Sequence, residues 1–348
     1  MIVASECRPV FAASRRMLRA LALAAVVFAL SVPGARAEKE INSKDIFRAV
    51  VGITASVPED ARSAVTLGTA RSGSGIVIDD KGLVLTIGYL ILEAHAAAVT
   101  DGTGELVPAN LVAYDQNTGF GLLRATKPLG IKPVALGSSD MLPEGAPVLV
   151  ISHGGPAPVF PAQVVARREF AGYWEYLLDN AIFTAPAHPQ FGGAALIGVD
   201  GRLVGVGSLI VNDAVKPGEP GPGNMFVPTD ALKPILKDLV KNGRARDPAH
   251  PWLGVYTEEN GGRLFVSRVA AGSPAEKAGI RKGDVIMGVG GHRVSGMADF
   301  LRKVWATGPA GVEVPLDLLP LSGGEMQIRP VKVRSLDRYD WLKLSKGL

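Results

Sequence analysis

The chain has 348 residues, a length typical of about two domains. It is 47% hydrophobic and 20% charged, which supports a packed core and excludes a chain that is disordered throughout. The net charge of +4 arises in residues 1–37, where five arginines accompany a single acidic residue, and the rest of the chain is neutral. A neutral remainder gives no electrostatic reason to expect binding to nucleic acid or to an anionic membrane.

The N-terminal segment has the pattern of a secretory signal. Three arginines between positions 15 and 19 precede an apolar run over residues 20–32, and an Ala-Arg-Ala sequence ends at Ala37. The apolar run is too short to cross a hydrocarbon core of about 30 Å, which argues against a membrane anchor. We therefore expect residues 1–37 to be a signal peptide, and the mature protein to be exported without an integral membrane span. In a Gram-negative source it would be periplasmic.

Cysteine usage fits an exported protein. The single cysteine, Cys7, lies inside the predicted signal peptide, so the mature chain contains neither a disulfide nor a cysteine ligand for a metal. The mature sequence also lacks a His-Glu-x-x-His motif and a phosphate-binding Walker loop. We expect no metal site and no cofactor.

From residue 53 to about residue 227, short β-rich runs alternate with turn sequences. Gly75–Ile78 precedes Asp79-Asp80-Lys81-Gly82, and Leu203–Val206 follows a turn that ends in Asp200-Gly201. Aspartate and glycine between β-branched residues are typical of hairpins. Many short strands at this spacing predict an antiparallel barrel or sandwich.

The sequence changes character after this β-rich region. Helical spacing of apolar residues predicts a helix over 230–242, with Gly243 as its C-cap, and residues 243–251 have the composition of a linker. A second unit is expected over residues 252–335, followed by a tail over 336–348. Within this unit we expect strands near 264–269, 285–289 and 312–319, and short helices at 274–278 and near 297–306.

One long motif in the second unit resembles the core of a bacterial PDZ domain. It is the sequence AGSPAEKAGIRKGDVI over residues 271–286, in which Pro274 suits an early helical position and Gly279 a helix C-cap. The sequence Trp252-Leu253-Gly254-Val255 stands where such domains place their carboxylate-binding loop. The resemblance implies that backbone N–H groups of Leu253, Gly254 and Val255 receive a peptide C-terminus, with Leu301 also at the peptide site. The alternative is a PDZ fold used only for packing or assembly.

The first unit combined with a PDZ domain is similar to the HtrA/Deg family of exported serine proteases. The similarity rests on GSGIVID over 73–79, LGSSD over 136–140 and NMFVP over 224–228, in that order along the chain. It implies a mainly β fold, in which a trypsin-like double β-barrel over residues 38–242 precedes an α+β PDZ domain. It also implies homo-oligomers, or co-assembly with an active homologue.

The residues at the expected catalytic positions do not fit proteolysis. Within recognisable flanking sequence, Tyr89 stands in place of the histidine base, Gly119 in place of the aspartate and Phe191 in place of the serine nucleophile. A tyrosine with an ordinary pKa is a poor base at neutral pH, and loss of the nucleophile removes the covalent route. The three positions therefore predict a degenerate triad and no catalytic residues.

The main alternative to an inactive protein is a catalytic serine–histidine pair at other positions of the chain. His95 lies six residues after Tyr89, and His188 lies three residues before Phe191. His153 directly follows Ser152, and Ser208 follows the Phe191 hairpin. Surface or structural roles explain these residues more simply. The sequence thus predicts a catalytically inactive HtrA-like protein that binds peptide C-termini or unfolded segments, as an adaptor, chaperone-like protein or regulator. An active serine endopeptidase with a relocated or misaligned nucleophile is the alternative.

Overall fold

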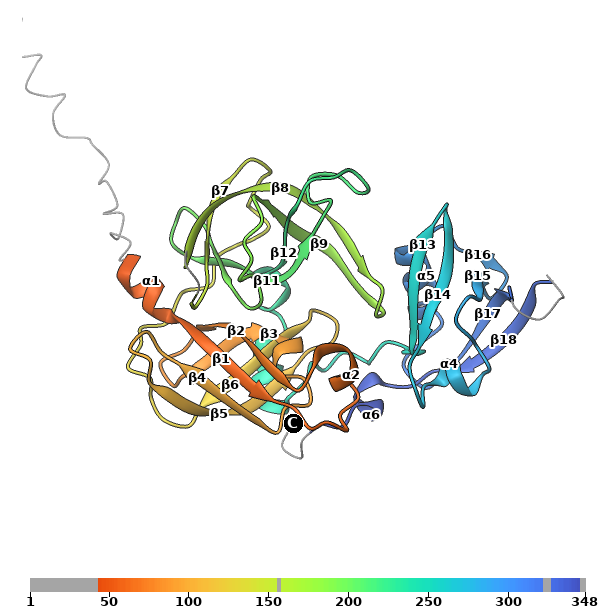
Figure 1. Ribbon diagram of the computed structural model, residues 1–348, viewed down its shortest axis with the longest axis horizontal. Helices are drawn as coiled ribbons and strands as arrows, with labels where there is room; N and C mark the ends of the chain where they lie inside the picture. The colour runs from red at the N-terminus through yellow and green to blue at the C-terminus, as the bar shows by residue number, and fades with distance from the viewer. Residues whose placement is uncertain (1–42, 155–157, 322–326, 345–348) are drawn as a thin grey trace, which may run out of the picture. The chain divides into compact units, whose positions relative to one another are not determined.

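The first barrel is built from six antiparallel strands that close on themselves in the order β1-β2-β3-β6-β5-β4. A computed structural model describes residues 43–154, 158–321 and 327–344, so the predicted signal peptide lies outside the described residues. Figure 1 shows this barrel in orange and yellow, after the short helix α1 (Ser43–Ala49). Its strands are β1 (Val50–Ser56), β2 (Ala70–Val77), β3 (Leu83–Ile87), β4 (Ala96–Thr100), β5 (Leu106–Tyr114) and β6 (Phe120–Ala125).

The second barrel repeats this plan, with the order β10-β11-β12-β9-β8-β7, and is drawn in green in Figure 1. Its two longest strands, β8 and β9, form a hairpin whose turn is Tyr173-Trp174-Glu175. The predicted mainly β fold with a double barrel is confirmed. The strands are β7 (Pro147–Ile151), β8 (Val159–Gly172), β9 (Tyr176–Ala185), β10 (Ala195–Ile197), β11 (Leu203–Val211) and β12 (Gly223–Pro228).

The predicted turn between β2 and β3 shows how local sequence sets the hairpins. The Asp79 carboxylate accepts hydrogen bonds from the backbone N–H groups of Lys81 and Leu83, at 2.9 and 2.7 Å. Gly82 has a φ of +74°, in the left-handed region that glycine adopts without steric cost. Arg124 on β6 forms an ion pair with Asp79 at 2.7 Å, which links the turn to a neighbouring strand.

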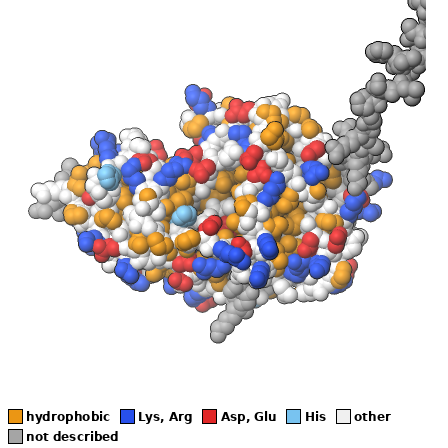
Figure 2. All heavy atoms as spheres, turned by 180° about the vertical axis from the view of Figure 1, so that it is seen from behind, with side chains coloured by type: hydrophobic (Ala, Val, Ile, Leu, Met, Phe, Trp, Pro, Cys, Tyr) orange, Lys and Arg blue, Asp and Glu red, His pale blue; other side chains and the backbone are white. Residues whose placement is uncertain are grey.

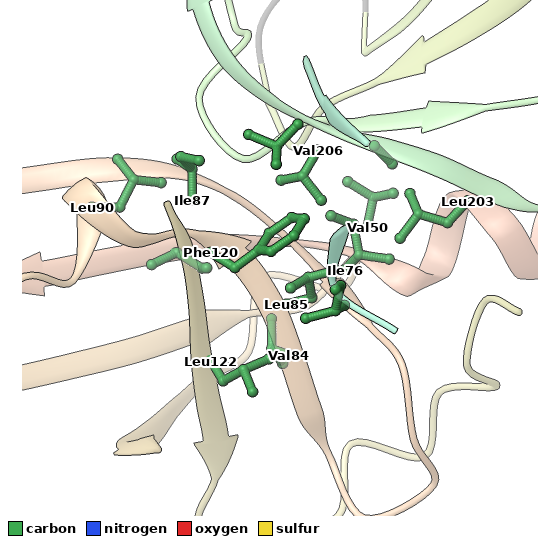
Figure 3. Close-up of a cluster of buried hydrophobic side chains, with 14 of the residues drawn as sticks. Val50, Ile76, Val84, Leu85, Ile87, Leu90, Phe120, Leu122, Leu203 and Val206 are labelled. Atoms are coloured by element: carbon green, nitrogen blue, oxygen red, sulfur yellow. The ribbon is translucent and has the colours of Figure 1, made fainter. Parts of the chain in front are cut away.

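The main hydrophobic core contains residues from both barrels. Phe120 is fully buried and lies at the centre of the cluster in Figure 3, with Val50, Ile76 and Leu85 of the first barrel nearby. Leu203 and Val206 of β11 belong to the same cluster. Burial of aromatic and branched aliphatic side chains supplies most of the stabilising free energy of such a core. This shared core fixes the region between the barrels, where the candidate site lies.

The helix predicted over residues 230–242 is shorter than expected. The chain forms a 3₁₀ turn, η2 (Thr229–Ala231), and the α-helix α3 begins only at Leu236 and ends at Asn242. Pro234 explains the difference, since proline lacks an N–H donor and disfavours helical geometry in the preceding residue. The predicted C-cap is confirmed: Gly243 has a φ of +74° and its N–H donates to the Leu239 carbonyl.

The C-terminal unit is a twisted sheet with two helices, as the sequence predicted. Its sheet has the order β13-β14-β15-β17-β18, and β16 pairs with β15. Ser273 caps α4, accepting a hydrogen bond from the Glu276 N–H, with Pro274 at the first turn. The elements are β13 (Val255–Asn260), β14 (Arg263–Val269), α4 (Pro274–Lys277), β15 (Val285–Val289), β16 (His292–Arg293), α5 (Met297–Trp305), β17 (Glu313–Leu319) and β18 (Arg329–Arg334).

The tail contains a short helix, α6 (Arg338–Trp341), that contacts both the first barrel and the C-terminal unit. Tyr339 donates a hydrogen bond to the Tyr114 carbonyl, and the Trp341 indole N–H donates to the Ala271 carbonyl at 3.0 Å. Leu342 is buried beside Tyr114. Within the described residues, no helix combines the length and apolar character needed to cross a membrane. Figure 2 shows charged side chains of both signs interspersed with hydrophobic ones.

Candidate functional site

The three positions that the family resemblance assigns to a degenerate triad lie together. Tyr89, Gly119 and Phe191 line one cavity of about 300 Å³, although they come from three separate segments of the chain. Ser208 lines the same cavity, and most of its other walls are apolar or aromatic, including Trp174. Among the residues that line the cavity there is no histidine, aspartate or glutamate. The lining of this cavity therefore supplies no imidazole or carboxylate, the side chains that most often act as a general base.

Tyr89 lies in the 3₁₀ turn η1 (Gly88–Leu90), directly after β3. Its hydroxyl donates a hydrogen bond of 2.9 Å to the backbone carbonyl of Ser208. Burial raises the pKa of Tyr89 above its usual range, because the charged phenolate would lose its hydration. Tyr89 is therefore a neutral hydrogen-bond donor that joins two segments of the cavity wall.

Gly119 precedes β6 and has a φ of +79°, a conformation that suits glycine. A Cβ atom at this position would lie 3.5 Å from the ring of Tyr176, so that ring fills the space beside it. The Tyr176 hydroxyl donates to the Thr118 carbonyl at 2.8 Å. Asp115, the preceding carboxylate in this loop, accepts hydrogen bonds from Thr118 and does not line the cavity.

The loop that carries Phe191 is tightly held by backbone contacts. Gly192 accepts a hydrogen bond from the Ser74 N–H at 2.8 Å, and the Gly193 N–H donates to the Gly207 carbonyl at 2.9 Å. Gly193 has a φ of +72°, and a Cβ atom there would lie 1.9 Å from the Ser74 carbonyl oxygen. No residue larger than glycine fits without movement of the backbone. The loop is thus ordered even though it carries a phenylalanine.

One serine–histidine pair does form elsewhere in the second barrel. Ser152 Oγ lies 2.9 Å from His188 Nε2, a pairing between residues that the sequence analysis considered separately. The two residues are only 3% and 1% exposed, and neither lines the described cavities. His188 stacks on Phe160, and burial lowers its pKa, so the ring is neutral at physiological pH.

The other residues considered as relocated catalytic groups, His95, His153 and Ser208, do not form a serine–histidine side-chain pair. His95 is exposed after η1. The backbone N–H of His153 donates to the Ser74 hydroxyl at 2.9 Å, and its ring lies against Gly52. Ser208 meets the Tyr89 hydroxyl through its backbone carbonyl. None of these observations places a histidine beside Ser208.

The expected peptide site of the second unit contains one carboxylate that the sequence analysis missed. The backbone N–H groups of Leu253, Gly254 and Val255 converge as the resemblance implied, and all three donate to the carboxylate of Glu175. Leu301 lies in α5, is 1% exposed and belongs to the core of this unit. The described residues contain no group of three His, Cys, Asp or Glu side chains suited to a metal ion.

Comparison with known proteins agrees with this architecture. The trypsin-like peptidase domain family matches residues 73–206, and the PDZ domain family matches residues 265–316. The chain is 28% identical over 262 residues to the periplasmic serine endoprotease DegP of Escherichia coli, covering 71% of this chain and 54% of DegP. It is a homologue of the HtrA/Deg serine proteases.

Other relatives and solved structures extend the comparison. The serine protease PepD of Mycobacterium tuberculosis is 28% identical over 283 residues, covering 75% of this chain and 60% of PepD. The HtrA-type protease AlgW with a decapeptide has a TM-score of 0.51 at 20% identity, covering 87% of this chain and 98% of that one. The structural likeness supports the fold alone. This HtrA homologue spans a little over half the length of the curated relatives it matches.

A fourth position also departs from the trypsin-like template. In that template, an oxyanion hole is formed by the backbone N–H of the nucleophile and the N–H of the residue two positions before it. In the alignment that the family resemblance implies, these two positions are Phe191 and Pro189, and proline has no N–H to donate. The sequence already contained this signal, because Pro189 replaces the first glycine of the loop.

Proposed function

We propose that the protein is an exported HtrA-like pseudoprotease that binds peptide C-termini or unfolded segments and does not cleave them. The observation that carries this proposal is the cavity in which Tyr89, Gly119 and Phe191 meet without a histidine or carboxylate in its lining. Acyl transfer to a serine needs a nucleophile, a base and a preorganised oxyanion hole. The cavity offers no base for Ser208, and Pro189 removes one oxyanion-hole donor.

The binding role rests on the PDZ domain. Its loop at Leu253, Gly254 and Val255 directs three backbone N–H groups to one point, which is the arrangement that captures a carboxylate. Strand β13 follows this loop and lies at an edge of the sheet, where an extended peptide can add as a further strand. Adaptor, chaperone-like and regulatory roles all use such binding. Export is supported by the predicted signal sequence and by relatives described as periplasmic.

A titration tests this proposal. The mature protein is titrated with a fluorescent peptide that ends in a hydrophobic residue and a free carboxylate, and with the same peptide ending in an amide. We expect saturable binding of the free acid and a loss of at least about tenfold in affinity for the amide, because the charge-assisted hydrogen bonds are lost. Equal affinity for both peptides, or no binding of either, would contradict the proposal.

A second candidate function is an endopeptidase that uses the Ser152–His188 pair. The distance of 2.9 Å between Ser152 Oγ and His188 Nε2 is the observation that favours it. The pair would have to become accessible, since both side chains are almost fully buried. Proteolysis that disappears in a Ser152→Ala variant would support this second candidate over the first.

A further inference from the structure

The carboxylate-binding loop of the PDZ domain is occupied by a side chain of the barrel domain. Glu175 lies at the tip of the β8–β9 hairpin and is 5% exposed. One of its oxygens accepts hydrogen bonds from the N–H groups of Gly254 and Val255, at 2.6 and 2.9 Å, and the other accepts one from Leu253 at 2.9 Å. A buried carboxylate is costly unless such bonds replace its hydration. These are the bonds that a peptide C-terminus would make.

The contact continues along the edge of the PDZ sheet. The Thr257 N–H on β13 donates to the Tyr173 carbonyl at 3.1 Å, two residues along β13 from Val255. Amides two residues apart point to the same side of a strand, so the hairpin satisfies two successive outward amides of this edge. The ring centroids of Tyr173 and Tyr256 are also 6.1 Å apart. The start of the edge that a peptide would extend is therefore already bonded to the hairpin, at Val255 and Thr257.

Side chains of the hairpin also reach the PDZ core and helix α5. Leu177 on β9 packs against the hydrophobic cluster that contains Leu253 and Leu301. Arg302 on α5 forms ion pairs with Glu169 and Asp179, which lie on β8 and β9. The hairpin thus supplies a carboxylate, a strand contact and an apolar side chain, the three features by which PDZ domains hold peptides.

The backbone of both partners suits this arrangement. Gly254 has a φ of +83°, and a Cβ atom there would lie 2.2 Å from Ser273 Cβ, so the loop requires glycine. Glu175 has a φ of +60°, which is uncommon for a residue with a side chain. Such a conformation persists when surrounding contacts determine it, and the three hydrogen bonds to the loop are contacts of this kind.

We infer that the β8–β9 hairpin is an intramolecular ligand of the PDZ groove, and that a peptide C-terminus binds only by displacing Glu175. This inference rests on the proposed peptide-binding function and specifies its regulation. A tethered ligand acts at an effective concentration that reaches the millimolar range, so weak carboxylate ligands are excluded. Ligands that succeed must combine a C-terminal carboxylate with an apolar last residue, and their apparent affinity is reduced by the fraction of molecules in which the hairpin is released.

The first test compares peptide affinity in full-length mature protein and in two variants. Glu175→Gly removes the carboxylate and accepts the positive φ, so the turn is preserved, while Glu175→Gln keeps the size of the side chain. Glu219→Gln is the matched control, because Glu219 is an exposed carboxylate of the same barrel that pairs with Lys216. We expect Glu175→Gly to bind the free-acid peptide at least about tenfold more tightly than wild type, Glu175→Gln to bind it no more tightly than Glu175→Gly because the amide keeps one accepting oxygen, and the control to match wild type. Equal affinities throughout would overturn the inference and leave the peptide-binding function intact.

A second measurement examines the contact without any peptide. Amide hydrogen exchange at Leu253, Gly254, Val255 and Thr257 is compared in wild type and Glu175→Gly. We expect protection in wild type and at least about tenfold faster exchange in the variant. At Leu253, Gly254 and Val255 the reason is loss of the Glu175 carboxylate that accepts their hydrogen bonds. At Thr257 the reason is release of the hairpin that carries the Tyr173 carbonyl. Unchanged exchange would overturn the inference. Faster exchange without peptide binding by any variant would support the intramolecular contact and sink the proposed peptide-binding function instead.

Discussion

The cavity at Tyr89, Gly119 and Phe191 and the N–H loop of the PDZ domain differ in how they depart from the functions that the family resemblance implies. At the cavity, backbone hydrogen bonds of Gly192 and Gly193 hold the loop in place, while the lining contains no histidine or carboxylate. In the PDZ loop the binding chemistry is intact, and a side chain of the same chain occupies it. Under the proposed function, the first site has lost its chemistry by substitution and the second withholds binding by occupancy. Only occupancy is reversible.

The largest expected effect tests whether the loop at Gly192 and Gly193 contributes to the stability of the fold. Gly193→Ala forces a positive φ on alanine and places Cβ against the Ser74 carbonyl, so we expect a loss of more than about 3 kcal/mol in the free energy of unfolding. Gly192→Ala is the matched control, where Cβ would lie 3.1 Å from the Tyr89 hydroxyl and the cost should stay below about 1 kcal/mol. Chemical denaturation measures both. Equal stability of the two variants would show that the loop is not held as described.

The pH dependence of peptide binding tests whether Glu175 occupies the PDZ loop. Burial raises the pKa of Glu175 to about 7, against the lowering effects of the three N–H donors and of Arg338, the charged side chain that faces it. A released glutamate has a pKa of about 4.3, so docking takes up a proton between these values. The docked hairpin is therefore most stable at low pH, and this stability is lost as pH rises through 7.

Because docking of the hairpin is coupled to protonation of Glu175, the ratio of two peptide dissociation constants should change with pH. The dissociation constant of wild type divided by that of Glu175→Gly, which has no side chain to dock, should fall by up to about tenfold between pH 6 and pH 8. Taking the ratio removes any titration of the peptide itself or of residues shared by both proteins. Fluorescence titrations at several pH values provide the constants. A ratio that stays constant or rises with pH would be inconsistent with a docked Glu175.

The smallest expected effect concerns the buried Ser152–His188 pair. Ser152→Ala leaves His188 Nε2 without its hydrogen-bond partner, so we expect a loss of about 1 kcal/mol in the free energy of unfolding. Thermal or chemical unfolding measures this loss. We expect no change in any hydrolytic activity of the preparation. A variant of normal stability that loses an existing peptidase activity would instead identify the pair as catalytic.

Much of the architecture could be predicted from the sequence because local signals determine it. The Asp79 turn, the Gly243 cap and the Pro274 helix start each depend on neighbouring residues, and each was found. The positions of Tyr89, Gly119 and Phe191 could be assigned because flanking sequence resembles a known family. The late start of α3 at Leu236 was missed although Pro234 was visible.

The two most informative contacts could not be predicted. Glu175 lies 78 residues from Leu253 in the chain, and Ser152 lies 36 residues from His188. No periodicity or turn signal connects residues at such separations, since tertiary folding alone brings them together. Glu175 in particular stands in an aromatic turn whose sequence gives no indication of a carboxylate partner.

The central proposal is that this protein has no peptidase activity. Mature protein is incubated with unfolded casein beside an active HtrA protease, with fragments followed over time and with Ser152→Ala and Ser208→Ala variants in parallel. Loss of triad members lowers kcat by about 10⁴-fold to 10⁶-fold, so we expect no fragments above background from wild type or either variant. Cleavage by wild type that survives repurification and disappears in either serine variant would contradict the account.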